Sequence, residues 1–206
     1  MEANHSIRAV IWDIGGVLVR TEDFTSREKL AEQFHISRKE LERAVFDSEI
    51  SWQAQNGHAS SQQMWQEIAR RFGLNGKQME DFETRFWEGD RLDSDLVELI
   101  SNLRPKFCTG LLSNAWPDAP ASLERRYGPF LSIFDTTVFS SQVGLTKPDR
   151  EIYLLLLSRM DLQPQEAVFI DDVQENIDGA RAVGMQGIRF KNREQIVADL
   201  NSMLGD

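Results

Sequence analysis

The 206-residue sequence contains a single cysteine, Cys108, so no disulfide can form within the chain. No apolar run approaches the length of a membrane span, and residues 1–5 lack the apolar stretch of a signal peptide. Lysine and arginine number 23 against 33 aspartates and glutamates, a formal net charge of −10 without a basic cluster. This balance argues against a nucleic acid or a membrane as the main partner. We therefore expect a soluble, cytoplasmic protein.

The chain is rich enough in hydrophobic residues to form a sizeable core: they make up 41% of the sequence, including 5 tryptophans and 12 phenylalanines. This length can form one large core or a core that carries a smaller insertion. The pattern favours an insertion. After a first strand at about 8–14, the region from about Phe24 to Trp87 shows only helical periodicity, with capping boxes at Ser37 and Ser60. This region predicts four helices in a small bundle.

The rest of the chain alternates between strands and helices, which predicts parallel strands joined by right-handed crossovers. Beyond the first strand, we expect strands at about 107–113, 136–139, 167–170 and 187–190, and helices at about 119–127, 174–183 and 194–204. The predicted fold class is α/β, with a three-layer, Rossmann-like parallel sheet. Residues 1–17 and 91–206 would form this core, and 18–90 an inserted helical cap. Cys108, at the start of its strand, is expected to be a small core residue.

Polar side chains typical of catalytic sites directly follow three apolar runs of the predicted sheet. They are Asp13, then the pair Ser113 and Asn114, then the pair Asp171 and Asp172. A single cation, Lys147, precedes Pro148 at a predicted helix start. Because ligands of such sheets bind beyond the carboxyl ends of the strands, these side chains should share one pocket. Paired acids, a lysine, a hydroxyl and an amide suit a divalent cation and a phosphate.

These stretches resemble, in order, the four motifs of the haloacid dehalogenase superfamily. The matching segments are Asp13-Ile14-Gly15-Gly16-Val17-Leu18, Ser113-Asn114, Lys147-Pro148-Asp149, and Asp171-Asp172 with Asn176. The predicted helical insertion also matches the helical cap that this superfamily carries between its first and second motifs. The resemblance implies a Mg²⁺-dependent phosphohydrolase. Its substrate would be a small phosphorylated metabolite, such as a sugar phosphate, and an aspartyl-phosphate would be its intermediate.

By this resemblance, Asp13 is the nucleophile, and Lys147 offsets the charge of the transferring phosphoryl group. Ser113 and Asn114 would bind phosphate oxygens together with Lys147. Gly16 belongs to the same phosphate-binding set, because glycine lets the backbone approach a ligand closely.

The resemblance also implies a set of metal ligands. They would be Asp13, the backbone carbonyl of Gly15, and Asp172 as the direct ligand of the acidic pair. Asp171 would contribute through water or through Lys147. Asn176 would steady the acidic loop.

One position departs from the superfamily pattern. Most of its phosphatases carry a second aspartate two residues after the nucleophile, where this chain has Gly15. Loss of a general acid–base group typically costs about 10²–10⁴ in rate. A branch with glycine at this position resembles our chain and includes phosphatases of glucose 1-phosphate. Two alternatives stay open: a metal-independent dehalogenase, and a catalytically weak or silent binding relative.

The cap is the predicted source of substrate specificity. Trp52 and Gln55 fall in a polar stretch that we expect to be irregular and to face the ligand. Trp52 could stack on a sugar, and Gln55 could bond its hydroxyls. The alternative is a simple surface turn with Trp52 packed into the bundle. Trp116, shortly after Asn114, is a further candidate for the border of the pocket.

Overall fold

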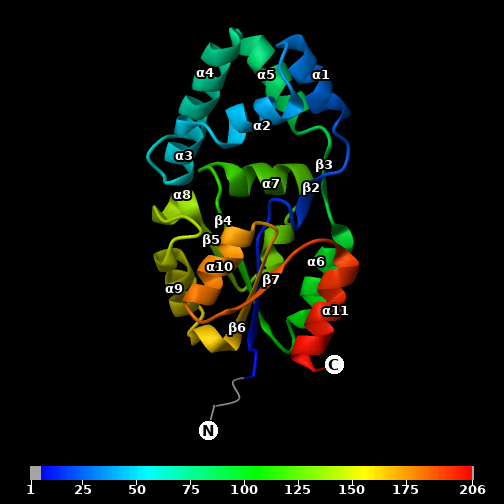
Figure 1. Ribbon diagram of the computed structural model, residues 1–206, viewed down its shortest axis with the longest axis vertical. Coiled ribbons are helices and arrows are strands. Elements are labelled where there is room, and N and C mark those ends of the chain that lie inside the picture. Colours follow the sequence, from blue (N-terminus) through cyan, green and yellow to red (C-terminus); the bar gives the residue numbers. More distant parts are fainter. Residues whose placement is uncertain (1–5, 206) are drawn as a thin grey trace.

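The computed structural model describes residues 6–205, so the segment 1–5, which the expectation about a signal peptide concerned, lies outside the described residues. Its centre is a five-stranded sheet in the order β5-β4-β1-β6-β7, and every pair of neighbouring strands is parallel (Figure 1). The strands are β1 (Ala9–Trp12), β4 (Cys108–Ser113), β5 (Thr136–Phe139), β6 (Ala167–Asp171) and β7 (Gln186–Arg189). Their order places β1 at the centre, with β4 on one side and β6 on the other.

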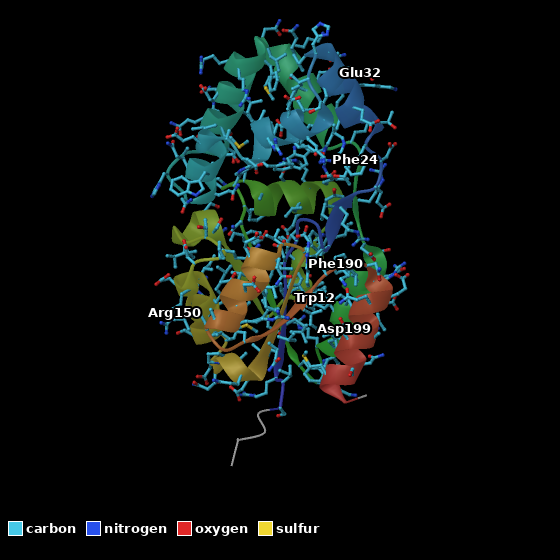
Figure 2. All side chains as sticks on the ribbon, viewed as in Figure 1. Trp12, Phe24, Glu32, Arg150, Phe190 and Asp199 are labelled. Atoms are coloured by element: carbon cyan, nitrogen blue, oxygen red, sulfur yellow. The ribbon has the colours of Figure 1, made fainter. Side chains whose placement is uncertain are left out.

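The sheet is buried on both faces, which explains why its strands are continuous apolar runs. In β1, Val10 and Trp12 pack into one hydrophobic cluster, with residues of α6 (Ser94–Leu103) and α11 (Arg193–Leu204). The alternate residues, Ala9 and Ile11, pack into a second cluster, with residues of α9 (Arg150–Arg159) and α10 (Gln174–Ala182). Trp12 is fully buried inside the core (Figure 2). The prediction of a three-layer α/β fold is confirmed.

The inserted segment contains five helices rather than the four that we predicted. They are α1 (Thr25–Gln33), α2 (Arg38–Phe46), α3 (Glu49–Gln55), α4 (Ser61–Phe72) and α5 (Gly76–Phe86). Both predicted capping boxes are present, and α4 ends at Gly73 in the left-handed region. The additional helix, α3, occupies the stretch that we expected to be irregular. Ser48 caps it through the amide of Ser51, and Ala54 anchors it in the cap core.

A two-stranded antiparallel ribbon joins the two parts of the molecule. Its strands are β2 (Val19–Thr21) and β3 (Asp90–Leu92), and Thr21 lies opposite Asp90. The sequence did not predict this ribbon, because each strand has three residues and its partner lies far away in the chain. We propose that the ribbon divides the protein into a core of residues 1–17 and 91–206 and a cap of residues 18–90. Helix α7 (Ala119–Tyr127) lies between the two parts (Figure 1).

The short helix α8 (Ser140–Val143) follows β5, and 3₁₀ turns at Phe130–Ile133 and Pro164–Glu166 complete the core. The prediction for Cys108 was wrong: its side chain is exposed, because it is the first residue of β4, at the margin of the sheet. Within residues 6–205, no helix combines the length and the apolar character that a bilayer crossing requires.

Candidate active site

Asp13 stands at the carboxyl end of β1, and a tight turn holds it there. Its amide donates to the carbonyl of Ile170 at 2.9 Å, which extends the pairing of β1 with β6 by one residue. The amides of residues 17, 18 and 19 then all donate to the carbonyl of Ile14, at 3.3, 2.8 and 2.8 Å. This turn folds the chain back directly after Asp13, whose side chain is buried. The backbone therefore fixes the position of the carboxylate.

The two glycines of this turn have different surroundings. Gly16 has a φ of +76°, and a Cβ there would lie 2.3 Å from an Oδ atom of Asp172. A side chain at this position would displace the carboxylate of Asp172. The amide of Gly16 donates to the carbonyl of Val19 at 3.0 Å, so this N–H is not free to bind a ligand. The contribution of Gly16 is that its backbone can pass close to neighbouring groups. Gly15 is exposed, and a Cβ added there would meet no atom within 4 Å.

Lys147 bridges two of the predicted acids. Its Nζ lies 2.7 Å from Oδ1 of Asp13 and 2.6 Å from Oδ2 of Asp171. Its backbone is fixed by Asn114, because the Lys147 amide donates to Asn114 Oδ1 at 2.8 Å and Asn114 Nδ2 donates to the Lys147 carbonyl at 2.9 Å. The second motif thus positions the lysine of the third. One N–H of the Asn114 amide is left for another acceptor.

The adjacent acids Asp171 and Asp172 have different environments. Asp171 is fully buried and accepts hydrogen bonds from the amide of Val173 at 2.8 Å and from Asn176 Nδ2 at 3.0 and 3.1 Å, besides its contact with Lys147. Asp172 is half-buried, and among the described residues no other side chain bonds or pairs with its carboxylate. Asp171 is therefore saturated by protein donors, whereas Asp172 keeps its oxygens open.

Burial dominates the acid–base properties of the site. It raises the pKa of Asp13 to about 6, against the attraction of Lys147 and with added repulsion from Asp171. Burial likewise raises the pKa of Asp172, and Asp171 adds to that effect. For Lys147, burial disfavours the ammonium form, but the attraction of Asp13 and Asp171 outweighs it and raises the pKa. The lysine therefore stays charged, whereas burial disfavours the ionised form of Asp13 and of Asp172.

The charges of the site fit a divalent cation. One carboxylate oxygen from each of Asp13, Asp171 and Asp172 lies within 4.8 Å of the others. Among residues 6–205, Lys147 is the only cationic side chain within salt-bridge distance of any of these acids, so ionisation of all three leaves an excess of negative charge. Carboxylate oxygens are the ligands that Mg²⁺ prefers. The residues present thus suit this ion in both ligand type and charge.

The structure brings the residues of all four predicted motifs to the carboxyl edge of the sheet. Ser113 is buried as the last residue of β4, at the same edge as Asp13. The two predicted cap residues form no hydrogen bond with these motifs among the described residues. Trp52 is 58% exposed, so it is not packed into the bundle. Gln55 donates to the carbonyl of Phe46 at 3.5 Å and to Ser51 Oγ at 3.4 Å, both within the cap. Their role in specificity stays a prediction.

Sequence reasoning missed one residue that shapes the site. Ser140 is fully buried; its Oγ accepts a hydrogen bond from the amide of Ala115 at 2.9 Å and lies 3.3 Å from the Ala115 carbonyl, to which it donates. This contact holds the loop that follows Ser113 and Asn114. Ser140 has no local motif, because its partner is 25 residues away, in another loop.

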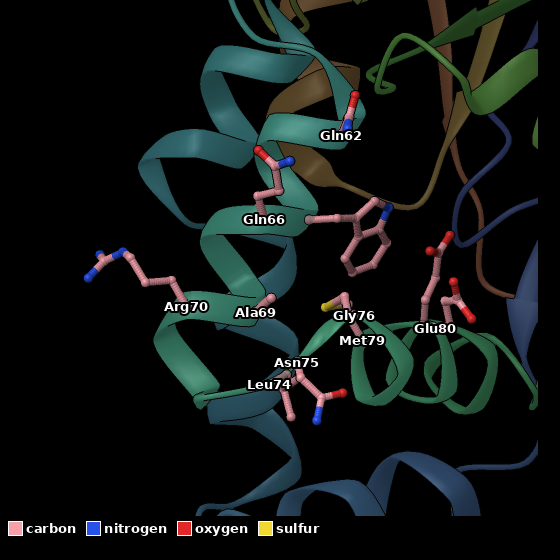
Figure 3. Close-up of a pocket in the computed structure, with 11 residues that line it drawn as sticks. Gln62, Gln66, Ala69, Arg70, Leu74, Asn75, Gly76, Met79 and Glu80 are labelled. Atoms are coloured by element: carbon pink, nitrogen blue, oxygen red, sulfur yellow. The ribbon is translucent and has the colours of Figure 1, made fainter.

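A separate groove of about 620 Å³ opens between α4 and α5 in the cap (Figure 3). It is lined by Gln62, Trp65, Gln66, Ala69, Arg70, Leu74, Asn75, Gly76, Met79, Glu80 and Glu83. None of these residues belongs to the site described above. The groove is therefore distinct from the cluster around Asp13.

This fold, with its acids and lysine at the carboxyl edge of a parallel sheet, agrees with the comparison to known families. The chain matches the haloacid dehalogenase-like hydrolases over residues 7–184 and belongs to this family. It is an enzyme of the hydrolase class.

Three similar proteins illustrate the range of this family. A sesquiterpene phosphatase of Aspergillus oryzae is 27% identical over 202 residues, which cover 97% of this chain and 98% of that protein. A drimenol cyclase of Aspergillus calidoustus is 25% identical over 204 residues, 97% of this chain but only 37% of that protein. A family enzyme of Bacteroides thetaiotaomicron, solved with magnesium and inorganic phosphate, superposes with a TM-score of 0.75 at 20% identity, over 90% of this chain and 95% of that one.

Proposed function

We propose that this protein is a Mg²⁺-dependent phosphohydrolase of a small phosphorylated metabolite, and that it acts through an aspartyl-phosphate. One observation carries the proposal: a buried lysine holds the Asp13 carboxylate beside two further acids whose charge it does not balance. The phosphatase name of the relative that spans this chain supports phosphate as the reacting group. The magnesium and phosphate of the solved neighbour support the cofactor.

We assign the metal ligands by the same argument. Asp13 and Asp172 would hold Mg²⁺ together with the backbone carbonyl of Gly15, because Asp172 has open oxygens and Gly15 is exposed in the turn that follows Asp13. Asp171 would act mainly by holding Lys147, since protein donors already occupy its oxygens. When bound, the ion supplies positive charge for the oxygens of the phosphoryl group.

The residues of the chain account for the first chemical step. A carboxylate oxygen of Asp13 attacks phosphorus, the bond from phosphorus to the leaving oxygen breaks, and the electron pair departs with that oxygen. Lys147 offsets the charge on the transferring group. Ser113 and the remaining N–H of Asn114 donate to its oxygens, while Gly16 allows close approach. The oxygen of a water molecule then attacks phosphorus, the bond from phosphorus to the Asp13 oxygen breaks, and inorganic phosphate leaves with the protons of that water while the carboxylate is restored.

Gly15 restricts the substrates that suit this site. A glycine transfers no proton, so the leaving oxygen must depart with little protonation. We infer a substrate with a good leaving group, such as a sugar 1-phosphate, as in the glycine-bearing branch that the sequence resembles. A cytoplasmic location, suggested by the single cysteine, stays part of the proposal. A silent binding relative is the second candidate, because the missing acid–base group favours it directly.

Asp13→Asn tests the nucleophile. It keeps the size of the side chain and removes the attacking carboxylate, so turnover should fall by about 10⁴-fold or more. The melting temperature should stay unchanged or rise, because the variant removes a buried charge. The measurement is a phosphometabolite screen with added magnesium that includes p-nitrophenyl phosphate, glucose 1-phosphate and acetyl phosphate.

The other outcomes of this screen identify the alternatives. Full activity of Asp13→Asn would rule out the assigned nucleophile. Release of halide from a haloacid in the presence of a chelator would identify a dehalogenase. Binding of inorganic phosphate without turnover of any phosphate ester would identify a silent relative.

A further inference from the structure

Trp116 belongs to the core by sequence but packs into the cap. Its ring stacks on Phe46 at 6.0 Å and 19°, and meets Trp65 and Trp87 edge-on at 5.6 and 5.9 Å. These partners come from the end of α2, from α4 and from the residue after α5. One side chain of the core thus contacts three separate parts of the cap.

A directional bond adds to this aromatic packing. Nε1 of Trp116 donates to Oγ of Ser51 at 2.9 Å, and Ser51 is fully buried in α3. Buried polar groups are costly without a partner, so this bond fixes the depth and orientation of the indole. The hydrogen bond and the ring contacts together define one position of the Trp116 indole in the cap.

The other end of this connection reaches the catalytic lysine. Ala115, next to Trp116, is clamped by the buried Ser140, and Asn114 exchanges two hydrogen bonds with the backbone of Lys147. Asn114 and Trp116 are two residues apart, a distance that extended backbone spans in about 7 Å at most. So short a link leaves little slack, so a shift of the Trp116 backbone would be passed on to Asn114.

We propose that Trp116 is a positioning residue that couples the seating of the cap to the placement of Asn114 and Lys147. With the indole seated against Ser51, the loop holds the lysine between Asp13 and Asp171. With the indole displaced, Asn114 loses its register with the Lys147 backbone. The consequence for turnover rests on the proposed function of the site, whereas the structural coupling does not.

The experiment compares Trp116→Ala with Trp65→Ala. Both variants remove a tryptophan from the same aromatic cluster. Trp65, however, lies in α4 of the cap, whereas Trp116 is only two residues from Asn114. With p-nitrophenyl phosphate and Mg²⁺, Trp116→Ala should lower kcat by about 10- to 100-fold with a smaller change in KM. Trp65→Ala should leave kcat within about twofold. Trp116→Phe, which keeps the ring stack but loses the hydrogen bond to Ser51, should lower kcat by less than Trp116→Ala does.

Hydrogen exchange of the Lys147 amide provides a measurement that does not depend on turnover. This amide donates to Asn114, so its exchange should accelerate by roughly tenfold in Trp116→Ala and stay unchanged in Trp65→Ala. A wild-type protein without phosphatase activity would overturn the proposed function and leave this second test valid.

Equal effects of Trp116→Ala and Trp65→Ala on exchange would overturn the coupling. If Trp116→Ala fails to fold, Trp116→Phe and Ser51→Ala decide the matter, because both remove the same hydrogen bond. Each should accelerate exchange at Lys147, and the double variant should exchange no faster than the faster single one. Unchanged exchange in both would reject the proposal.

Discussion

Two clusters of buried charge, one in each part of the molecule, are built in different ways. In the first, Arg27 contacts Asp90 at 2.8 Å and Glu42 at 3.2 Å and donates to the carbonyl of Phe86 at 2.8 Å. Arg38 adds two contacts to Glu42, at 2.7 and 2.9 Å. We call these four charged residues the Arg27 cluster. Two arginines face two acids, and each charge has an opposite partner.

The cluster around Lys147 lacks this balance. Its one ammonium group faces three acids, and Asp172 has no cationic partner within salt-bridge distance among residues 6–205. Buried ion pairs that only support a fold are tolerated when each charge is compensated. Uncompensated charge in a pocket marks a place where a charged ligand binds. The contrast separates a charge-balanced cluster that supports the fold from the cluster that we propose as the active site.

Among the variants that test this contrast, the largest effect on turnover should come from adding another acid to the cluster around Lys147. Gly15→Asp has room, since a Cβ there meets no atom within 4 Å, and it supplies the missing proton donor. Hydrolysis of phosphate esters with poor leaving groups should rise by about 10²-fold or more. Gly15→Asn, of equal size without a proton to transfer, is the control. Equal rates for the two variants would show that proton transfer does not limit turnover.

Breaking the balanced cluster should affect stability instead. Arg27→Met leaves Asp90 unpaired in the interior, and should lower the free energy of unfolding by about 3–5 kcal/mol in urea titrations. Burial raises the pKa of Asp90, so protonation relieves the unpaired charge and the loss should shrink as the pH falls. Arg70→Met, at an exposed cap position, should change stability by no more than about 0.5 kcal/mol. A similarly small change in the free energy of unfolding for Arg27→Met would show that the Arg27 cluster does not stabilise the fold.

The smallest expected effect is stabilisation by the metal. Magnesium at a concentration 100 times its dissociation constant should stabilise the wild type by about 2.7 kcal/mol, measured by thermal unfolding. Asp172→Asn should lose most of this response, because it removes the open carboxylate. Glu42→Gln, in the Arg27 cluster, should keep the full response despite a lower starting stability. A wild type that does not respond to magnesium at any concentration would mean that the excess charge is not a metal site.

The sheet and the cluster around Lys147 could be predicted from sequence, because local signals determine both. Strands buried on both faces are continuous apolar runs, and residues 136–139 were placed with the bounds of β5. Parallel strands end at one edge, so Asp13 and Asp171 had to meet there once the strands were identified. Lys147, before a predicted helix start, was expected in the same pocket, and it pairs with both acids. The open oxygens of Asp172 and the saturation of Asp171 needed the structure, since both depend on the exact turn after β6.

The cap was harder to predict, because its organisation depends on distant partners. Helix α3 is short and polar in sequence, and its helical state rests on the Ser48 cap and on a few buried residues. The charge compensation of Arg27 joins residues of the cap's first helix to Asp90, 63 positions later. The link from Trp116 to Ser51 spans 65 positions. No periodicity in a single segment carries such information.

The ribbon of β2 and β3 has a consequence for how such an enzyme diversifies. Thr21 and Asp90 face each other across it, and their side chains share a hydrogen bond at 2.6 Å. The chain therefore leaves the core for the inserted segment and returns from it through two adjacent, paired strands. Another helical module could be grafted there without altering the order of the sheet. If the cap selects the substrate, as we propose, substrate choice could change there without a change to the residues around Asp13.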